Sequence, residues 1–302
     1  MASVNQLAVL FILLALGFAG CRLKALTPET GQILTKLVFN ITLPCTMLSS
    51  AITGELGIGA LDTLLFILKV ILVYFIYLAI ALPLSRVFGG NKRLRGLYAF
   101  MMIFANVAFM GIPVASAVFG PDAVFYISVF GIPFWISSFT FGSALVAGKA
   151  DKFEPKSLLT PVFITSMLVV PLALLNFRAP DIIVDALGLA GSITTPASML
   201  IIGVTLAQEP IKAVFKNVRL YPIAFIKLIV IPTVVWLILR LFLTDPYILG
   251  ILVLLSAMPT AAIAAMFAIE HKNNETVASG GVFITTLFSG ITIPLIIHIF
   301  AL

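Results

Sequence analysis

The chain has 302 residues, of which 61% are apolar and only 10% are charged. Soluble domains carry roughly 25% charged residues, so this composition excludes a soluble enzyme, a disordered tail and a nucleic-acid-binding protein. The formal net charge is +6, but the 18 lysines and arginines are too sparse to form a basic patch. The two cysteines, Cys21 and Cys45, have no metal-ligand spacing, so we expect no disulfide, metal site or cofactor.

Ten segments are apolar over lengths that can cross a bilayer, which requires about 20 residues. We therefore predict an all-α polytopic membrane protein. No lysine or arginine precedes the first segment, so it is predicted to be a span rather than a cleaved signal. The predicted spans are Val4–Gly20, Leu34–Thr53, Leu61–Leu84, Gly96–Val118, Ala123–Ala147, Leu158–Asn176, Ile183–Ala207, Leu220–Leu243, Tyr247–Ile269 and Thr276–Ala301.

The basic residues predict how these spans are oriented. The odd-numbered loops carry 14 lysines and arginines and the even-numbered loops carry two, Arg178 and Arg240. Positively charged loops stay in the cytoplasm, so both termini are expected to be extracytoplasmic. That orientation requires an even number of spans, as predicted.

Two similar motifs indicate an internal repeat. The second span contains Ile-Thr-Leu-Pro-Cys-Thr-Met-Leu around Pro44, and the seventh contains Ile-Thr-Thr-Pro-Ala-Ser-Met-Leu around Pro196. The offset, 196 − 44 = 152, is about half the chain. Five spans per half is an odd number, so the second half must be inverted, as is typical of secondary transporters. We predict a first five-span repeat (1–148), a short cytoplasmic linker (149–156) and a second, inverted repeat (157–302).

Prolines inside matching spans predict helix breaks. Pro113 lies within the fourth span, seven residues after Asn106, and Pro259 lies within the ninth. Because proline lacks an N–H and frees a carbonyl one turn earlier, such breaks survive in a membrane only inside protein or beside a wet cavity. Paired interrupted spans point to a midplane binding site, where new half-helices present free N–H groups. Pro44 and Pro196 are weaker candidates, for which a simple kink is the alternative.

Charged residues inside the spans are few. All twelve carboxylates lie in loops or near span ends, and only Lys69 and Lys227 lie well inside spans. A lysine inside the membrane indicates function unless its long side chain reaches the interface, and both alternatives stay open here. Lys69 and Lys227 are therefore candidates for support or charge coupling. Two helix N-termini, an amide and a lysine favour an anion.

The stretch Asn-Val-Ala-Phe-Met-Gly-Ile-Pro (106–113) closely resembles the crossover segment of the auxin efflux carrier family. So do Ala-Met-Pro (257–259), Phe-Ala-Ile-Glu (267–270) and Gly-Val-Phe (281–283). The resemblance covers nearly the whole chain. The loop at 148–156 has nine residues, whereas plant members have a long cytosolic loop there, which argues against auxin as the substrate. The chain is more similar to microbial members described as permeases for malate or malonate.

The resemblance implies ten spans in two inverted repeats, with spans four and nine unwound at their prolines and crossing, a fold shared with bile acid:sodium symporters. Spans one, two, six and seven would form a scaffold, often dimeric, and the others a transport domain that moves as an elevator. It implies that Asp62 lies near a support site. It also implies that a carboxylate is held by Asn106, Gly111, Ile112, Pro113, Met258, Pro259 and Thr260.

Two functions compete. The favoured one is a permease or efflux carrier of small organic carboxylate anions in the cell membrane, working as a homodimer. The alternative is a sodium-coupled organic anion symporter, in which carbonyls and threonines bind the sodium. A sensor would carry an output domain for which the loops leave no room. An enzyme is not expected, because no Ser/His pair, carboxylate dyad or histidine cluster shares a span.

Overall fold

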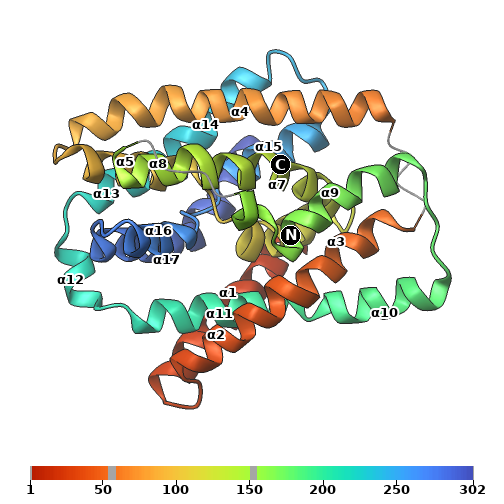
Figure 1. Cartoon of the computed structure of the whole chain (residues 1–302), viewed down its shortest axis with the longest axis horizontal. Coiled ribbons are helices and arrows are strands. Elements are labelled where there is room, and N and C mark those ends of the chain that lie inside the picture. Colours follow the sequence, from red (N-terminus) through yellow and green to blue (C-terminus); the bar gives the residue numbers. More distant parts are fainter. Residues whose placement is uncertain (1, 54–58, 150–154, 302) are drawn as a thin grey trace. The chain divides into compact units, whose positions relative to one another are not determined.

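The computed structural model describes residues 2–53, 59–149 and 155–301, and these residues are almost entirely helical. Figure 1 traces the helices from α1 (Ala2–Arg22) to α17 (Glu275–Phe300). Residues 150–154 of the predicted linker lie outside the described part, and the linker's end forms a short 3₁₀ turn, Pro155–Leu158.

Seven helices in the described part are long and apolar enough to cross a membrane. Three shorter apolar helices account for the fourth, sixth and ninth predicted segments. The predicted all-helical, polytopic membrane fold is therefore confirmed, whereas the ten-span inverted repeat remains a prediction. The long helices are Asn5–Arg22, Pro28–Ala51, Ala60–Val87, Ala123–Ala147, Asp181–Gln208, Leu220–Leu239 and Glu275–Phe300; the shorter ones are Val107–Phe119, Pro161–Leu174 and Pro246–Ser256.

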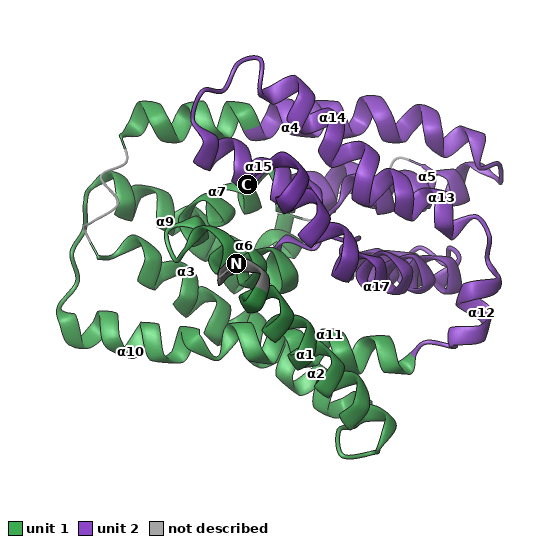
Figure 2. Cartoon of the chain, turned by 180° about the vertical axis from the view of Figure 1, so that it is seen from behind, with its two compact units in different colours: residues 1–69, 108–135, 155–208 green, residues 70–107, 136–154, 209–302 purple. Residues whose placement is uncertain are grey.

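The chain forms two compact units that interleave along the sequence (Figure 2). Unit 1 consists of residues 1–69, 108–135 and 155–208, and unit 2 of residues 70–107, 136–154 and 209–302. Unit 1 contains the whole of the first, second and seventh predicted spans, and the sixth as well. Unit 2 contains the eighth, ninth and tenth, whereas spans three, four and five are divided between the units.

Unit 1 packs its helices through close backbone contacts. Its helices are α1, α2 (Pro28–Leu37), α3 (Leu43–Ala51), the start of α4 (Ala60–Val87), α6 (Ile112–Phe119), most of α7 (Ala123–Ser137), α9 (Pro161–Leu174), α10 (Asp181–Ser192) and α11 (Thr194–Gln208). A Cβ added to Gly203 of α11 would lie 2.1 Å from the carbonyl oxygen of Leu14 in α1. These two helices therefore approach more closely than any residue with a side chain would allow, as is typical of membrane helix pairs.

Unit 1 also brings the two similar motifs into contact. The hydroxyl of Thr194 donates to that of Thr42 at 2.9 Å, and the two residues occupy the same place in their motifs. Thr46 lies 2.8 Å from Thr194 through the hydroxyl oxygens. Contact between equivalent residues is compatible with an approximate twofold axis passing near Thr42 and Thr194. It supports the predicted repeat without testing its full extent.

Unit 2 holds the remaining helices and both extended segments considered below. They are the end of α4, α5 (Lys92–Ile103), α8 (Ser143–Ala147), α12 (Ile211–Lys216), α13 (Leu220–Phe225), α14 (Ile231–Leu239), α15 (Pro246–Ser256), α16 (Ile263–Glu270) and α17. α17 packs against α12, α13, α15 and α16, so one long helix backs the shorter ones.

Three prolines follow wide helical turns rather than breaks. π-helical turns at 38–42, 107–111 and 226–230 each lead directly into a helix whose second residue is Pro44, Pro113 or Pro232. A π turn is a common way to accommodate a proline without ending a helix. The predicted breaks at Pro44 and Pro113 are therefore wrong in position, because the chain stays helical through both. At Pro196 the chain shows only a turn at Ile193 between α10 and α11.

Candidate functional site

The first break lies before Pro113. α5 ends at Ile103, and Phe104 is extended, with φ −93° and ψ 111°. The chain becomes helical again only at Val107. The break therefore comprises residues 104–106, and it includes Asn106, whose exposed fraction is 6%.

The second break does contain its predicted proline. α15 ends at Ser256, and the chain resumes a helix only at Ile263, the first residue of α16. Met258 and Thr260 are completely buried, on either side of Pro259. This break lies in unit 2 together with residues 104–106.

The two breaks pair with each other as short antiparallel strands. The N–H of Asn106 donates to the carbonyl of Pro259 at 2.7 Å, and the N–H of Ala261 donates to the carbonyl of Phe104 at 2.9 Å. Ala105 and Thr260 form the bridge between them. Each break therefore satisfies backbone groups of the other, which would cost several kcal/mol each if left bare in hydrocarbon.

Two side chains brace this pairing. The hydroxyl of Thr260 donates to the carbonyl of Met101 in α5 at 2.9 Å. Its N–H donates to the hydroxyl of Thr285 in α17 at 3.1 Å. Thr260 thus links the second break to α5 and α17, and its structural role is clear whether or not it also binds substrate. Thr285 was not predicted as a site residue, and nothing in the sequence separates it from the other hydroxyl-bearing residues of its span.

Free backbone donors remain where α16 begins. Ala262, the residue before α16, provides no side-chain cap. Among the described residues, no acceptor is found for the N–H groups of Ala262 and Ile263. Helix N-termini carry partial positive charge and bind anions through such N–H groups. This end of the break can therefore hold a carboxylate.

A buried cation lies at the other end of the same break. Lys227 is completely buried, and its Nζ donates to the carbonyl of Ser256, the last residue of α15, at 3.3 Å. The same Nζ lies 5.4 Å from the ring centroid of Tyr77 in α4. The hydroxyl of Tyr77 donates to Oγ of Ser256 at 2.6 Å.

This arrangement explains how a lysine is held inside the helices of unit 2. The C-terminal end of a helix carries partial negative charge and free carbonyls, and the ammonium group is placed at that end of α15. Complete burial rules out the alternative that Lys227 reaches the membrane surface. Tyr77 and Ser256 were not predicted, because each shares its span with other polar residues and the contact with Lys227 is tertiary.

The other predicted site residues lie elsewhere. Gly111, Ile112 and Pro113 belong to unit 1, where α6 packs against α1 and α11. Asp62 is exposed in the first turn of α4, and Lys69 is half-buried further along the same helix. Lys69 and Lys227, which lie in corresponding spans of the predicted repeat, thus differ in burial. The described residues contain no group of three histidine, cysteine, aspartate or glutamate side chains that could hold a metal ion.

Comparison with known proteins agrees with this architecture. A family model described as membrane transport protein matches the chain twice, over residues 2–155 and 149–297. The chain belongs to this membrane transport protein family, which is the auxin efflux carrier family of the sequence resemblance. A curated relative, the uncharacterized transporter MJ1031 of Methanocaldococcus jannaschii, is 24% identical over 310 aligned residues, and the alignment covers 98% of each chain. Membership of the membrane transport protein family identifies the chain as a multi-pass membrane transporter.

Proposed function

We propose that this member of the membrane transport protein family is a secondary transporter, a permease or efflux carrier, for small organic carboxylate anions. The observation that carries the proposal is the pairing of two extended segments inside unit 2, with free N–H groups at the start of α16. Paired broken helices of this kind bind substrates near the middle of the membrane in secondary transporters.

The charges around the second break support an anion. The positive end of α16 and the ammonium group of Lys227 lie on the two sides of the break at 257–262. Asn106 lies in the paired segment and adds an amide. A carboxylate oxygen accepts hydrogen bonds from N–H groups and is attracted by both positive ends. We assign substrate contact to Asn106, Met258, Pro259 and Thr260, whereas Gly111, Ile112 and Pro113, which belong to unit 1, are not part of the proposed site.

The division into two units supports an elevator mechanism. Unit 2 contains the whole pairing of the two breaks, so it could carry a bound substrate as one body. In the proposed cycle the part of the chain that holds the two breaks moves and the first, second, sixth and seventh spans stay fixed, in a homodimer in the plasma membrane with both termini extracytoplasmic. Asp62 and Lys69 keep a predicted supporting role.

Lys227 favours this proposal over a sodium-coupled symporter. A sodium ion at the second break would be drawn to the free carbonyls of Ala257, Met258 and Thr260, and the ammonium group of Lys227, at the adjacent carbonyl of Ser256, would repel it. Without a coupling ion, an inside-negative potential drives an anion outward by about 2.3 kcal/mol per charge per 100 mV. We therefore expect net export of the anion.

Flux in proteoliposomes tests the proposal. We expect uptake of radiolabelled malate or malonate that follows an imposed membrane potential and does not change when sodium is replaced by choline. Asn106→Ala should lower this flux at least tenfold. Asn217→Ala is the matched control, because the side chain of Asn217 makes no hydrogen bond in the described residues and lies after α12. Equal flux in wild type and Asn106→Ala would refute the assigned site, and strong sodium dependence would favour the symporter.

A further inference from the structure

A cavity of about 330 Å³ lies in unit 2, away from the paired breaks. It is formed by the end of α4, the start of α5, and the helix that ends with α8. Four basic side chains line it: Arg86, Lys92, Arg95 and Lys149. No carboxylate lines it, and the ion pair found in the described part of the chain, Arg178 with Asp181, lies in unit 1. The cavity therefore carries an uncompensated positive charge among the described residues; Asp151 and Glu154, near Lys149 in the sequence, lie outside them.

The cavity changes from apolar to cationic in the same direction along its helices. Leu82 lies one helical turn before Arg86 on the same face of α4. Phe141 and Leu145, four residues apart, share a face near the end of their helix, and Lys149 follows that end after Gly148, whose φ is +71°. α5 begins at the cationic end of the cavity, so along this helix the cations Lys92 and Arg95 come before the small residue Ala99. Each helix thus places an apolar or small residue deeper in the membrane and a cation at its end.

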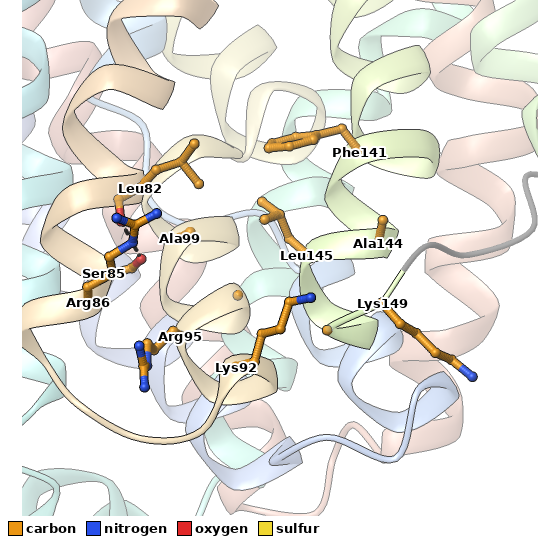
Figure 3. A pocket seen from close by; sticks show the side chains of 12 residues that line it. Leu82, Ser85, Arg86, Lys92, Arg95, Ala99, Phe141, Ala144, Leu145 and Lys149 are labelled. Carbon is orange, nitrogen blue, oxygen red and sulfur yellow. Dashed lines mark hydrogen bonds between the residues drawn. The ribbon is translucent and has the colours of Figure 1, made fainter.

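Figure 3 shows how these side chains lie. Leu82, Phe141 and Leu145 lie in the upper part of the view, where the guanidinium group of Arg86 turns toward Leu82, and Lys92, Arg95 and Lys149 lie in the lower part. The ammonium group of Lys92 points between α5 and α8, whereas Lys149 extends away from the cavity. Arg95 is held at the rim by a 2.7 Å hydrogen bond from its Nε to the carbonyl of Gly90.

The cations also stand where a helix disfavours them. Lys92, Arg93 and Arg95 occupy the first turn of α5, the end that already carries partial positive charge and normally attracts acidic residues. Arg93 has a separate structural contact, because its Nε donates to the carbonyl of Ala147 at 3.2 Å. An anion in the cavity would offset the repulsion among Lys92, Arg95 and the helix end.

We propose that this cavity binds the phosphate headgroup of an anionic phospholipid. The cations at the helix ends hold the phosphate, and Leu82 and Phe141 contact the start of an acyl chain. The side chain of Phe141 is 39% exposed, so this apolar wall is open to such a chain. A lipid fits better than a soluble phosphate ester, because a soluble ester has no acyl chain to contact the apolar wall. Basic pockets between membrane helices on the cytoplasmic side bind acidic lipid headgroups, and the positive loops here are predicted to be cytoplasmic.

Native mass spectrometry of the purified, delipidated full-length protein tests the proposal. Phosphatidylglycerol and phosphatidylcholine with identical acyl chains are added back, and the retained lipid is counted as collision energy rises. We expect wild type to retain one phosphatidylglycerol at least tenfold more than phosphatidylcholine. The double variant Arg86→Gln/Lys92→Gln should reduce this preference to less than twofold, and Arg86→Lys/Lys92→Arg should retain it. Lys212→Gln/Lys216→Gln, which removes the same charge from exposed positions of α12 in the same unit, should also retain it.

Three outcomes overturn the proposal. The first is equal phosphatidylglycerol preference in wild type and in Arg86→Gln/Lys92→Gln. The second is equal retention of both lipids by wild type. The third is displacement of the lipid by glycerol 3-phosphate at tenfold excess, which would make the ligand a soluble phosphate ester. If the double variant does not purify as a monodisperse species, Lys92→Gln is tested alone, because Lys92 is exposed and its replacement should not disturb folding. This variant should show a preference for phosphatidylglycerol at least threefold lower than that of wild type.

Discussion

Replacing Lys227 by methionine separates a role in substrate binding from a role in folding. Methionine keeps much of the side-chain volume and removes the positive charge. The change loses a 3.3 Å hydrogen bond to the carbonyl of Ser256 and the cation–π contact with Tyr77. Those losses cost about 1–3 kcal/mol for the bare carbonyl and about 1–2 kcal/mol for the ring contact. The change also removes a buried ammonium group, and the desolvation penalty of several kcal/mol that this group imposes on the folded state is removed with it. We therefore expect the free energy of unfolding to change by no more than about 2 kcal/mol.

The effect on substrate binding follows from charge and distance. Ser256 and Ala262 are six residues apart, so a substrate at the start of α16 lies within about 20 Å of Lys227. At an effective dielectric constant of about 20, a unit charge at that distance contributes about 0.8 kcal/mol, and at about 10 Å it contributes about 1.7 kcal/mol. Lys227→Met should then weaken binding of a monocarboxylate by about 4-fold to about 17-fold.

A dicarboxylate makes this prediction sharper. The electrostatic energy is proportional to substrate charge, so the logarithm of the affinity loss for malate should be twice that for lactate. The assay is the concentration dependence of flux in proteoliposomes, together with the unfolding temperature of each variant. Lys227→Arg should keep both affinities. Tyr77→Phe, which removes the hydrogen bond to Ser256 but keeps the ring, controls for disturbance of the packing. Unchanged affinities for both substrates, with an unfolding temperature lowered by more than about 10 °C, would show that Lys227 has only a structural role.

Two further changes test the helix geometry. Pro259→Ala supplies an N–H at the centre of the second break and should lower transport at least about tenfold, which corresponds to about 1.4 kcal/mol. Pro113→Ala should keep transport within about threefold, because the helix is already continuous there. Equal losses of flux in the two variants would contradict the position of the breaks. Gly203→Ala should lower the free energy of unfolding by about 2 kcal/mol or more in a thermal unfolding assay, since the new Cβ would meet the backbone of Leu14. Gly188→Ala is the control, because nothing lies within 4 Å of the Cβ position of this residue in α10. It should leave the free energy of unfolding unchanged or raise it by about 0.5–1 kcal/mol. A similar loss of stability in Gly203→Ala and Gly188→Ala would mean that close packing of α1 and α11 does not cause the loss.

Helices whose pattern is local were predictable. The third predicted span, Leu61–Leu84, corresponds to α4 at Ala60–Val87, and the tenth, Thr276–Ala301, to α17 at Glu275–Phe300. In both, a continuous apolar run between charged ends determines the element, because the bilayer sets the length of a spanning helix. Asn274, whose side chain accepts from the N–H of Val277, marks the start of α17 as a cap should.

The position of the first break was not predictable from its own residues. Proline was expected to end the helix, but the π turn at 107–111 accommodates Pro113 within a continuous helix. The break at 104–106 contains neither proline nor glycine. It is extended because its backbone groups pair with residues 259–261, more than 150 positions away. A tertiary contact of this kind overrides local helix preference, so only the Pro259 break carried a local signal.

The pairing of the breaks also explains why the proposed anion would bind at one end of the second segment. Each extended strand satisfies the other through the Asn106–Pro259 and Phe104–Ala261 hydrogen bonds, and Thr285 accepts from the N–H of Thr260. The carbonyl end of α15 is neutralised by Lys227. Among the described residues, the N–H groups of Ala262 and Ile263 at the start of α16 have no acceptor, and the carbonyls of Ala257, Met258 and Thr260 accept no hydrogen bond. A carboxylate at the start of α16 would supply the acceptors that these N–H groups lack, whereas a sodium ion would have to bind at the carbonyls of Ala257, Met258 and Thr260, so the position of the bound ligand decides between the two functions.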